Sequence, residues 1–438
     1  MSDPGLSRDI RTGSWVVVWR VVGVASNIVW TLVLSRFYGP AVVGIFATFY
    51  TVVSVASLAA RFGLDRASIR FIGQLLASPD RAILGFASRI RLVVVALAVV
   101  VALGLGAAAG PLGGLFSLGS EGVLVLTVAA AAVLPHSLAL VLGEQLRAVD
   151  AVTHYAFVSF ALVPLGAMLA LPLAEVWGLP LPPLFAYLGG AAVAVAVGLV
   201  QWRRSTADLR SAPVSRPAPR LNDVLPVATH MLLAGSMLLV VEWSDILILS
   251  SFRSQDEVGV YSVAARVAML VSFAALPVAS ILGPRIAQAW GVGDWIAIRA
   301  HYHGGRRWMS AFGLPVAATV FVAAPWLLSL FGSSFVAGST ALRLLAVGHL
   351  ASMLAGPVGY ALDMTGSHRA WQRILWVAGI LNIGLNVVMI PRWGAGGAAL
   401  ASLLAMLTWN GLGVAFLLRD LARRPERPRG GAQVEWAA

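Results

Sequence analysis

The sequence predicts an all-α integral membrane protein of about twelve transmembrane helices, built as two six-helix bundles related by a pseudo-two-fold axis along the membrane normal. Three observations predict this fold class: an apolar composition, a regular spacing of apolar stretches, and a motif that occurs twice. Hydrophobic residues make up 59% of the 438-residue chain and charged residues 11%, whereas soluble globular proteins carry about 25% charged residues. The chain contains no cysteine, which excludes disulfides, thiolate catalysis and cysteine-ligated metal sites. We expect neither a cofactor nor a metal site.

Apolar stretches long enough to cross a bilayer recur along the whole chain. A spanning helix needs about 20 such residues, because no backbone amide is left unpaired in hydrocarbon. The first group lies at about 14–36, 40–60, 83–109, 121–146, 154–176 and 183–202. The second group lies at about 224–250, 258–284, 309–331, 340–363, 371–391 and 396–418. The first stretch is too long for a signal peptide and carries Arg20, so we expect it to be a membrane span.

The arginines predict how these spans are oriented. All 31 basic residues are arginine, and 25 of them fall on the cytoplasmic side if the N-terminus is cytoplasmic. Four fall on the outer side, namely Arg36, Arg253, Arg343 and Arg392, and the other two, Arg20 and Arg266, lie inside spans. The positive-inside rule therefore predicts that both termini are cytoplasmic. The net charge of +12 is explained by this asymmetry and by attraction to anionic lipid, not by nucleic-acid binding.

A polar segment separates the two groups of spans. Residues 203–220 read RRSTADLRSAPVSRPAPR, which is typical of a linker. The expected domains are an N-terminal half at 1–202, a cytoplasmic linker at 203–222, a C-terminal half at 223–418 and a disordered cytoplasmic tail at 419–438. Residues 61–82 predict an interfacial amphipathic segment that acts as a basic anchor.

A motif near the first outer turn occurs again 215 residues later. LSRFYGPAVVGIF at 34–46 matches LSSFRSQDEVGVY at 249–261 at Leu, Ser, Phe, Val and Gly. Each copy lies between the first two spans of its half, and Arg70 falls on Arg285 at the same shift. An even number of spans per half makes the two halves parallel repeats.

These segments, with GLDRASIR at 63–70 and SDILILSSFRSQDEVGVYSVAARV at 244–267, resemble bacterial polysaccharide and lipid-linked oligosaccharide flippases. That family belongs to the MOP superfamily, which also holds the lipid II flippases and the multidrug and toxin (MATE) extruders. The resemblance implies a bacterial cytoplasmic (inner) membrane protein that is not an enzyme. It implies translocation of an isoprenoid-diphosphate-linked oligosaccharide, a cell-surface polysaccharide precursor, to the outer leaflet by alternating access. The implied partners are the polyprenyl-diphosphate-linked glycan, the bilayer, a coupling ion (Na+ or H+) and polysaccharide polymerase machinery.

Two arginines inside spans are the candidate substrate-binding residues. An ionisable side chain at mid-bilayer costs about 2.5–3.5 kcal/mol, so it faces a cavity or a partner. Arg20 and Arg266 carry guanidinium forks that suit a diphosphate, and the resemblance places them in a central cavity between the halves. Two structural alternatives stay open: Arg266 pairs with Glu242 on the neighbouring span, and Arg20 extends to the headgroups.

Five polar residues are candidates for supporting roles. Glu242 and Asp245 lie three residues apart on one helix face, and Asn27 falls on Glu242 through the repeat. Asp245 is either a cation-coupling carboxylate or a hydrogen-bonded residue near the outer helix end, and the second role is favoured. Asn382 and Asn386, spaced i, i+4, predict interhelical hydrogen bonds.

Two other functional classes compete with the flippase. A multidrug or cation extruder of the same superfamily needs acidic cavity residues, and the first half has no acidic cluster. A membrane glycosyltransferase, polymerase or ligase needs a long outer loop with carboxylates or a paired acidic motif beside the first span, and the longest outer loop here has about a dozen residues and contributes no acid pair.

Overall fold

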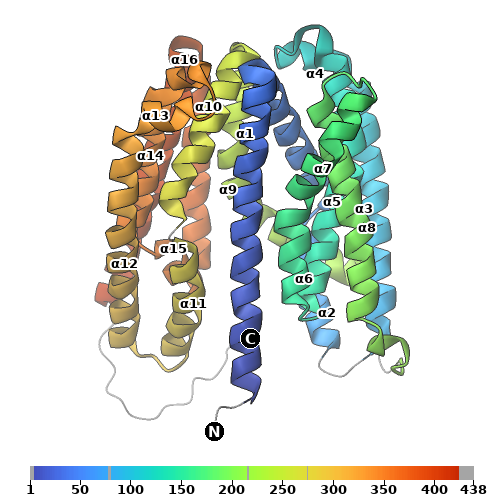
Figure 1. Ribbon diagram of the computed structural model, residues 1–438. Helices are drawn as coiled ribbons and strands as arrows, with labels where there is room; N and C mark the ends of the chain where they lie inside the picture. Colours follow the sequence, from blue (N-terminus) through green and yellow to red (C-terminus); the bar gives the residue numbers. More distant parts are fainter. Residues whose placement is uncertain (1–3, 77–79, 215–216, 274, 424–438) are drawn as a thin grey trace. The chain divides into compact units, whose positions relative to one another are not determined.

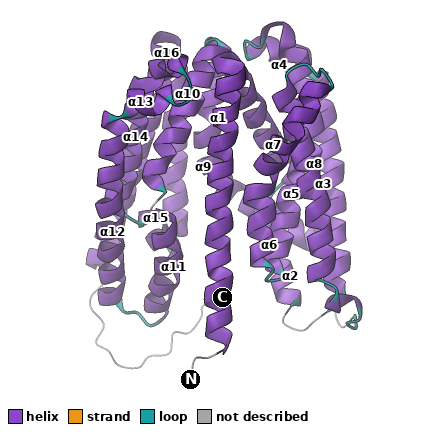
Figure 2. Cartoon of the chain, viewed as in Figure 1, coloured by secondary structure: helices purple, strands orange, loops and turns teal. Residues whose placement is uncertain are grey.

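Helices joined by short loops make up most of the part of the chain that the computed structural model describes, residues 4–76, 80–214, 217–273 and 275–423 (Figures 1 and 2). It divides into two compact units. The N-unit comprises residues 1–236 with 254–256, and the C-unit comprises 237–253 with 257–438. Each unit is described by itself below.

The N-unit contains two long spanning segments joined by a kink and four further spans. Helix α1 (Pro4–Arg61) is broken at Gly39, whose φ of 77° is open to glycine and costly for other residues. The remaining elements are α2 (Leu64–Leu75), α3 (Ala82–Ala107), α4 (Ala109–Leu115), η1 (Gly119–Glu121), α5 (Gly122–Ala148), α6 (Val152–Ala156), the π-helical turn η2 (Phe157–Ala161), α7 (Leu162–Val176), α8 (Pro182–Ser205) and η3 (Asp208–Arg210).

The C-unit shows a similar order of elements. It begins within α9 (Leu221–Phe252) and continues with α10 (Gln255–Ala268), η4 (Met269–Ser272), α11 (Ala275–Gly291), α12 (Trp295–Val322), α13 (Ala324–Ser329), η5 (Ser333–Gly338), α14 (Ser339–Ala355), α15 (Val358–Met364) and α16 (His368–Arg423). Helix α16 is broken at Gly394, with φ 53°, in the same way that α1 is broken at Gly39.

The helices are long and apolar enough to cross a bilayer. Within the described residues, 7 helical segments satisfy length and hydropathy for a span. Two of them, in α1 and α16, are 44 and 56 residues long and are kinked at a glycine, so each has room for two spans at about 20 residues per span. The prediction of an all-α membrane protein with about twelve spans is confirmed.

The segment predicted as a basic anchor at 61–82 packs against protein. The segment forms α2, and its apolar side chains Leu64, Ile72 and Leu75 are buried in the N-unit core instead of lying on a lipid surface. Gly63 starts this helix with φ 73°, and a methyl group there would clash with the carbonyl oxygen of Ala228 on α9. Protein packing therefore takes up the apolar face that the sequence pattern assigned to lipid.

The segment between the two groups of spans packs on the N-unit. Helix α8 continues to Ser205, Leu209 is buried, and Arg89 on α3 donates to the carbonyl of Pro219. Residues 419–423 of the expected tail belong to α16, and residues 424–438 lie outside the described residues.

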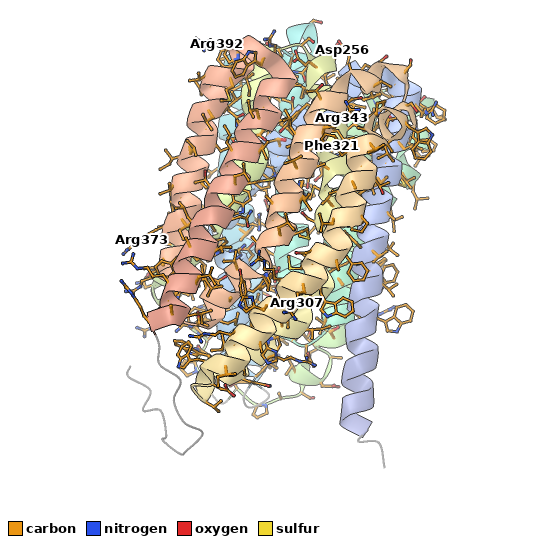
Figure 3. All side chains as sticks on the ribbon, turned by 90° about the vertical axis from the view of Figure 1, so that its left-hand side faces the viewer. Asp256, Arg307, Phe321, Arg343, Arg373 and Arg392 are labelled. Atoms are coloured by element: carbon orange, nitrogen blue, oxygen red, sulfur yellow. The ribbon has the colours of Figure 1, made fainter. Side chains whose placement is uncertain are left out.

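Figure 3 shows the arginines of the C-unit at two ends. Arg343 and Arg392 lie nearer one end, whereas Arg307 and Arg373 lie nearer the other. The positive-inside rule predicts the first pair on the outer side and the second pair on the cytoplasmic side. The two pairs lie toward opposite ends of the C-unit, in agreement with this prediction.

Candidate functional site

Arg20 lies on α1 with its guanidinium group packed inside the N-unit. Its Cζ is 5.0 Å from the centroid of the Phe160 ring. Its Nε is buried and has no hydrogen-bond partner among the described residues. Among the described residues no carboxylate forms an ion pair with this guanidinium, which lies over a ring and keeps an unsatisfied N–H, so it is suited to bind an anion.

A π-helical turn supplies the aromatic surface under Arg20. Turn η2 presents Phe157 to Trp19, with ring centroids 4.5 Å apart, and Phe160 to Arg20. Gly23 allows the helices to approach, because a Cβ there would lie 2.6 Å from the carbonyl oxygen of Phe160. Single π-turns within α-helices occur frequently at functional sites.

Arg266 lies in the last turn of α10 and is half-buried. The 3₁₀ turn η4 follows directly, so the eighth predicted span is not a continuous α-helix, and a 3₁₀ stretch within a helix often marks a hinge. Arg20 and Arg266 belong to different units. The side chain of Glu242 lies outside the described residues, so its pairing with Arg266 stays a prediction.

Asn27 is exposed and bonds within its own helix. Its Nδ2 donates to the carbonyl oxygen of Gly23 at 2.9 Å. It follows Arg20 by seven residues, which is two helical turns, so both lie on one face of α1.

Asp245 is the centre of a buried hydrogen-bond network in the C-unit. The residue is 6% exposed. The hydroxyl of Tyr261 donates to its Oδ2 at 2.6 Å, Asn386 Nδ2 donates to its Oδ1 at 2.5 Å, and the hydroxyl of Ser402 donates to Oδ2 as well. These donors offset the cost of burying a carboxylate. Asp245 is hydrogen-bonded, as the favoured prediction states, and α9 continues for seven residues beyond it.

The two asparagines of α16 complete this network. Asn386 Nδ2 also donates to Asn382 Oδ1 at 3.1 Å, and the Ser244 hydroxyl donates to the same oxygen at 2.9 Å. The predicted interhelical hydrogen bonds are confirmed. Asn386 Oδ1 is buried without a partner among the described residues, so an acceptor next to the carboxylate is unsatisfied.

The sequence did not predict several residues near Arg20 and in the Asp245 network. Tyr155, Phe160 and Ser402 carry no charge and stand in apolar runs without a distinguishing pattern. Tyr261 lies at the end of the repeated turn motif, and that repeat was a usable signal for it. No group of three or more His, Asp or Glu residues that could hold a metal ion occurs in the described part of the chain.

A family model described as "Polysaccharide biosynthesis protein" matches residues 11–290. This range contains Arg20, Asp245 and Arg266. The chain belongs to the polysaccharide biosynthesis protein family. A MatE family model matches residues 227–388, so the predicted membership of this family and of the MOP superfamily is confirmed.

The relatives of this family member include an archaeal flippase. The "Probable low-salt glycan biosynthesis flippase Agl15" of Haloferax volcanii is 26% identical over 164 residues, which make up 37% of this chain. The match spans only 35% of the archaeal protein.

Solved structures show the same fold. The lipid II flippase MurJ in an inward closed conformation superposes with a TM-score of 0.74 at 13% identity, covering 95% of this chain and 88% of MurJ. An inward-facing multidrug resistance MATE family transporter of the MOP superfamily gives 0.73 at 16% identity, covering 91% and 94% of the two chains. This polysaccharide biosynthesis protein is therefore a multi-pass membrane protein of the flippase and transporter fold.

Proposed function

We propose that the protein flips an isoprenoid-diphosphate-linked oligosaccharide from the inner to the outer leaflet by alternating access. The observation that carries the proposal is Arg20, whose guanidinium lies over the Phe160 ring and keeps a buried Nε–H without a partner among the described residues. The family match and the glycan flippase among the relatives support the glycan class of substrate. In this proposal the membrane is a bacterial cytoplasmic membrane, both termini are cytoplasmic, and polymerase machinery receives the glycan outside.

The diphosphate is the part of the substrate that the arginines bind. A guanidinium stays protonated at all relevant pH values and makes paired hydrogen bonds to phosphate oxygens. Arg20 from the N-unit and Arg266 from the C-unit are the proposed diphosphate ligands. Asn27 and Glu242 are proposed to support them, Asn27 because it lies on the same face of α1 as Arg20.

Asp245 is the proposed site of a coupling cation, Na+ or H+. Its carboxylate and the unsatisfied Asn386 Oδ1 lie in one buried network. A cation there would neutralise the carboxylate and satisfy the orphan acceptor, since hard cations prefer oxygen ligands. Binding in the C-unit would then favour one arrangement of α9, α10 and α16, which all contribute to the network.

Equilibrium binding tests the substrate class. The full-length protein in nanodiscs is titrated with labelled polyprenyl diphosphate, the matching monophosphate and the matching alcohol. We expect the diphosphate to bind best, and Arg20→Ala and Arg266→Ala each to weaken it about tenfold or more, because charge-assisted phosphate contacts are lost. Equal affinity for the alcohol would contradict the proposal.

The second candidate function is export of cationic compounds, as in the MATE extruders. The buried carboxylate of Asp245 and the fold similarity to a MATE transporter favour it. The same titration with amphiphilic cations separates the two. Binding of cations that depends on Asp245, without binding of the diphosphate lipid, would establish the extruder instead.

A further inference from the structure

Two arginines of the N-unit are linked through the rings of Tyr155 and Phe160. Arg147 Cζ lies 5.4 Å from the centroid of the Tyr155 ring, and Arg20 Cζ lies 5.0 Å from the centroid of the Phe160 ring. The Tyr155 ring meets Phe160 edge to face, with centroids 5.7 Å apart and planes at 72°. Arg147, Tyr155, Phe160 and Arg20 therefore form one continuous stack, here called the arginine–aromatic ladder.

The two ends of the ladder differ in exposure. The Arg147 side chain is 50% exposed and stands in the last turn of α5, whereas Arg20 is half-buried and Tyr155 is buried. Tyr155 lies in α6, which starts directly after the α5–α6 turn. The ladder thus leads from the surface of the N-unit, at the end assigned to the cytoplasm, to the proposed diphosphate ligand Arg20.

The exposed arginine is only loosely neutralised. Its carboxylate neighbour is Glu144, whose Oε2 lies 3.5 Å from Arg147 Nη1, at the long limit for a hydrogen bond. Glu144 also interacts electrostatically with Arg66. The other carboxylate near Glu144 is Asp65, and it is paired with Arg61. The arginines of this cluster outnumber its carboxylates.

We propose that Arg147 forms a rim subsite that captures the phosphate groups of the substrate before they reach Arg20, with Tyr155 as the positioning residue for the Arg147 guanidinium. This inference rests on the proposed function. The Tyr155 ring holds the Arg147 plane by a cation–π contact, which leaves the guanidinium edge open for phosphate oxygens. Glu144 competes with the phosphate for Arg147 and sets how strongly the rim attracts it.

The rim subsite makes a kinetic prediction that a structural role does not make. An exposed charge at the edge of a binding site acts on the association rate and its salt dependence more than on dissociation. Neutralising Arg147 is therefore expected to slow association, and neutralising Glu144 is expected to accelerate it. If Arg147 and Glu144 only stabilised the α5–α6 turn, both substitutions would lower the stability of the protein. They would then not change the association rate in opposite directions.

Stopped-flow binding of fluorescent farnesyl diphosphate tests the proposal with the full-length protein in phosphatidylcholine nanodiscs. Arg147→Ala is expected to slow association about tenfold and to flatten its salt dependence. Arg147→Lys, which keeps the charge without the fork, is expected to lie between this variant and wild type. Glu144→Gln is expected to accelerate association about threefold. Tyr155→Phe keeps the ring that holds Arg147, so it is expected to leave the association rate at the wild-type value.

Two results would overturn the rim subsite alone. One is an association rate equal to that of wild type in either Arg147→Ala or Glu144→Gln, while Arg20→Ala still lowers the affinity. The other is displacement of the probe by phosphatidylglycerol as strong as by unlabelled farnesyl diphosphate, which would make this a general lipid-headgroup site. Absence of diphosphate binding in the wild-type protein would reject the proposed function and the rim subsite together. Arg147→Lys and Glu144→Gln keep side-chain size, so thermal unfolding at the wild-type temperature shows that they fold.

Discussion

At matching positions of the repeat, the C-unit has hydrogen-bonding side chains and the N-unit has aromatic ones. Shifted by 215 residues, Asp245 falls on Trp30, Tyr261 on Phe46 and Ser402 on Tyr187. In the C-unit these residues form a hydrogen-bond network. In the N-unit they form an aromatic cluster, with Trp30 and Phe46 centroids 5.6 Å apart and Phe46 and Tyr187 centroids 5.9 Å apart.

This difference shows that the repeat fixes geometry but not chemistry. The contact between the first and second spans of each half is kept, since Trp30 meets Phe46 as Asp245 meets Tyr261. An aromatic cluster gains stability from burial and from ring–ring contacts, whereas a buried carboxylate needs hydrogen-bond donors. The buried carboxylate network occurs in the C-unit only, although burying it costs free energy. We therefore expect it to serve a function such as cation coupling.

Moving the carboxylate to the N-unit should have the largest effect. Trp30→Asp places a charge against Phe46 and Tyr187, where the aromatic cluster offers no set of donors like that of Tyr261, Ser402 and Asn386. We expect a loss of several kcal/mol in stability, because an unpaired buried charge is uncompensated. Thermal unfolding in detergent measures it, with Trp30→Phe as the control that keeps an aromatic ring. Equal unfolding temperatures for the two variants would contradict the comparison.

Removing the charge from the C-unit should abolish coupling with a smaller cost in stability. Asp245→Asn keeps the shape of the side chain but replaces one acceptor oxygen with an NH2 group. The donors of Tyr261, Ser402 and Asn386 then compete for the one remaining oxygen, which we expect to cost about 1–3 kcal/mol of stability. Transport measured with and without an imposed Na+ or H+ gradient should be stimulated in wild type and in Trp30→Phe but not in Asp245→Asn. Stimulation of Asp245→Asn at the wild-type level would remove Asp245 from coupling.

The outer turns of the two halves offer a comparison with a small expected effect. The Arg253 side chain donates to the carbonyls of Ile390 and Pro391, and Tyr38, its repeat counterpart, donates to Glu175, which is the counterpart of Ile390. Both contacts join the first and fifth spans of a half. Arg253→Ala loses several hydrogen bonds and Tyr38→Phe loses one, so we expect about 1 kcal/mol or less for each, with the larger loss for Arg253→Ala. Unfolding temperatures in the reverse order would show that the contacts are not equivalent.

The sequence predicted the helices well because the bilayer imposes their length. The span expected at 183–202 is α8 at 182–205, and the one expected at 121–146 is α5 at 122–148. Gly39 before Pro40 marked the first kink. The break of the eighth span at η4 was not predicted, because residues 269–272 are as apolar as their neighbours and tertiary contacts decide their backbone.

The sites were predicted only where a charge stood out. Arg20, Arg266 and Asp245 were visible because ionisable residues are rare in spans. Phe160 was not, because its contact with Arg20 depends on the π-turn at 157–161, which shifts side chains off the 3.6-residue period of an α-helix. The α2 segment shows the converse: its amphipathic pattern was read correctly, but a pattern does not say whether protein or lipid covers the apolar face.

The most direct test is leaflet-resolved translocation of a labelled polyprenyl-diphosphate-linked glycan in proteoliposomes. The wild-type protein is compared with Arg20→Ala, Arg20→Lys and Arg266→Ala at equal levels of inserted protein. We expect both alanine variants to slow translocation about tenfold or more and Arg20→Lys to retain part of the rate, because a point charge replaces the fork. Translocation at the wild-type rate in both alanine variants would contradict the assignment of these arginines to the diphosphate.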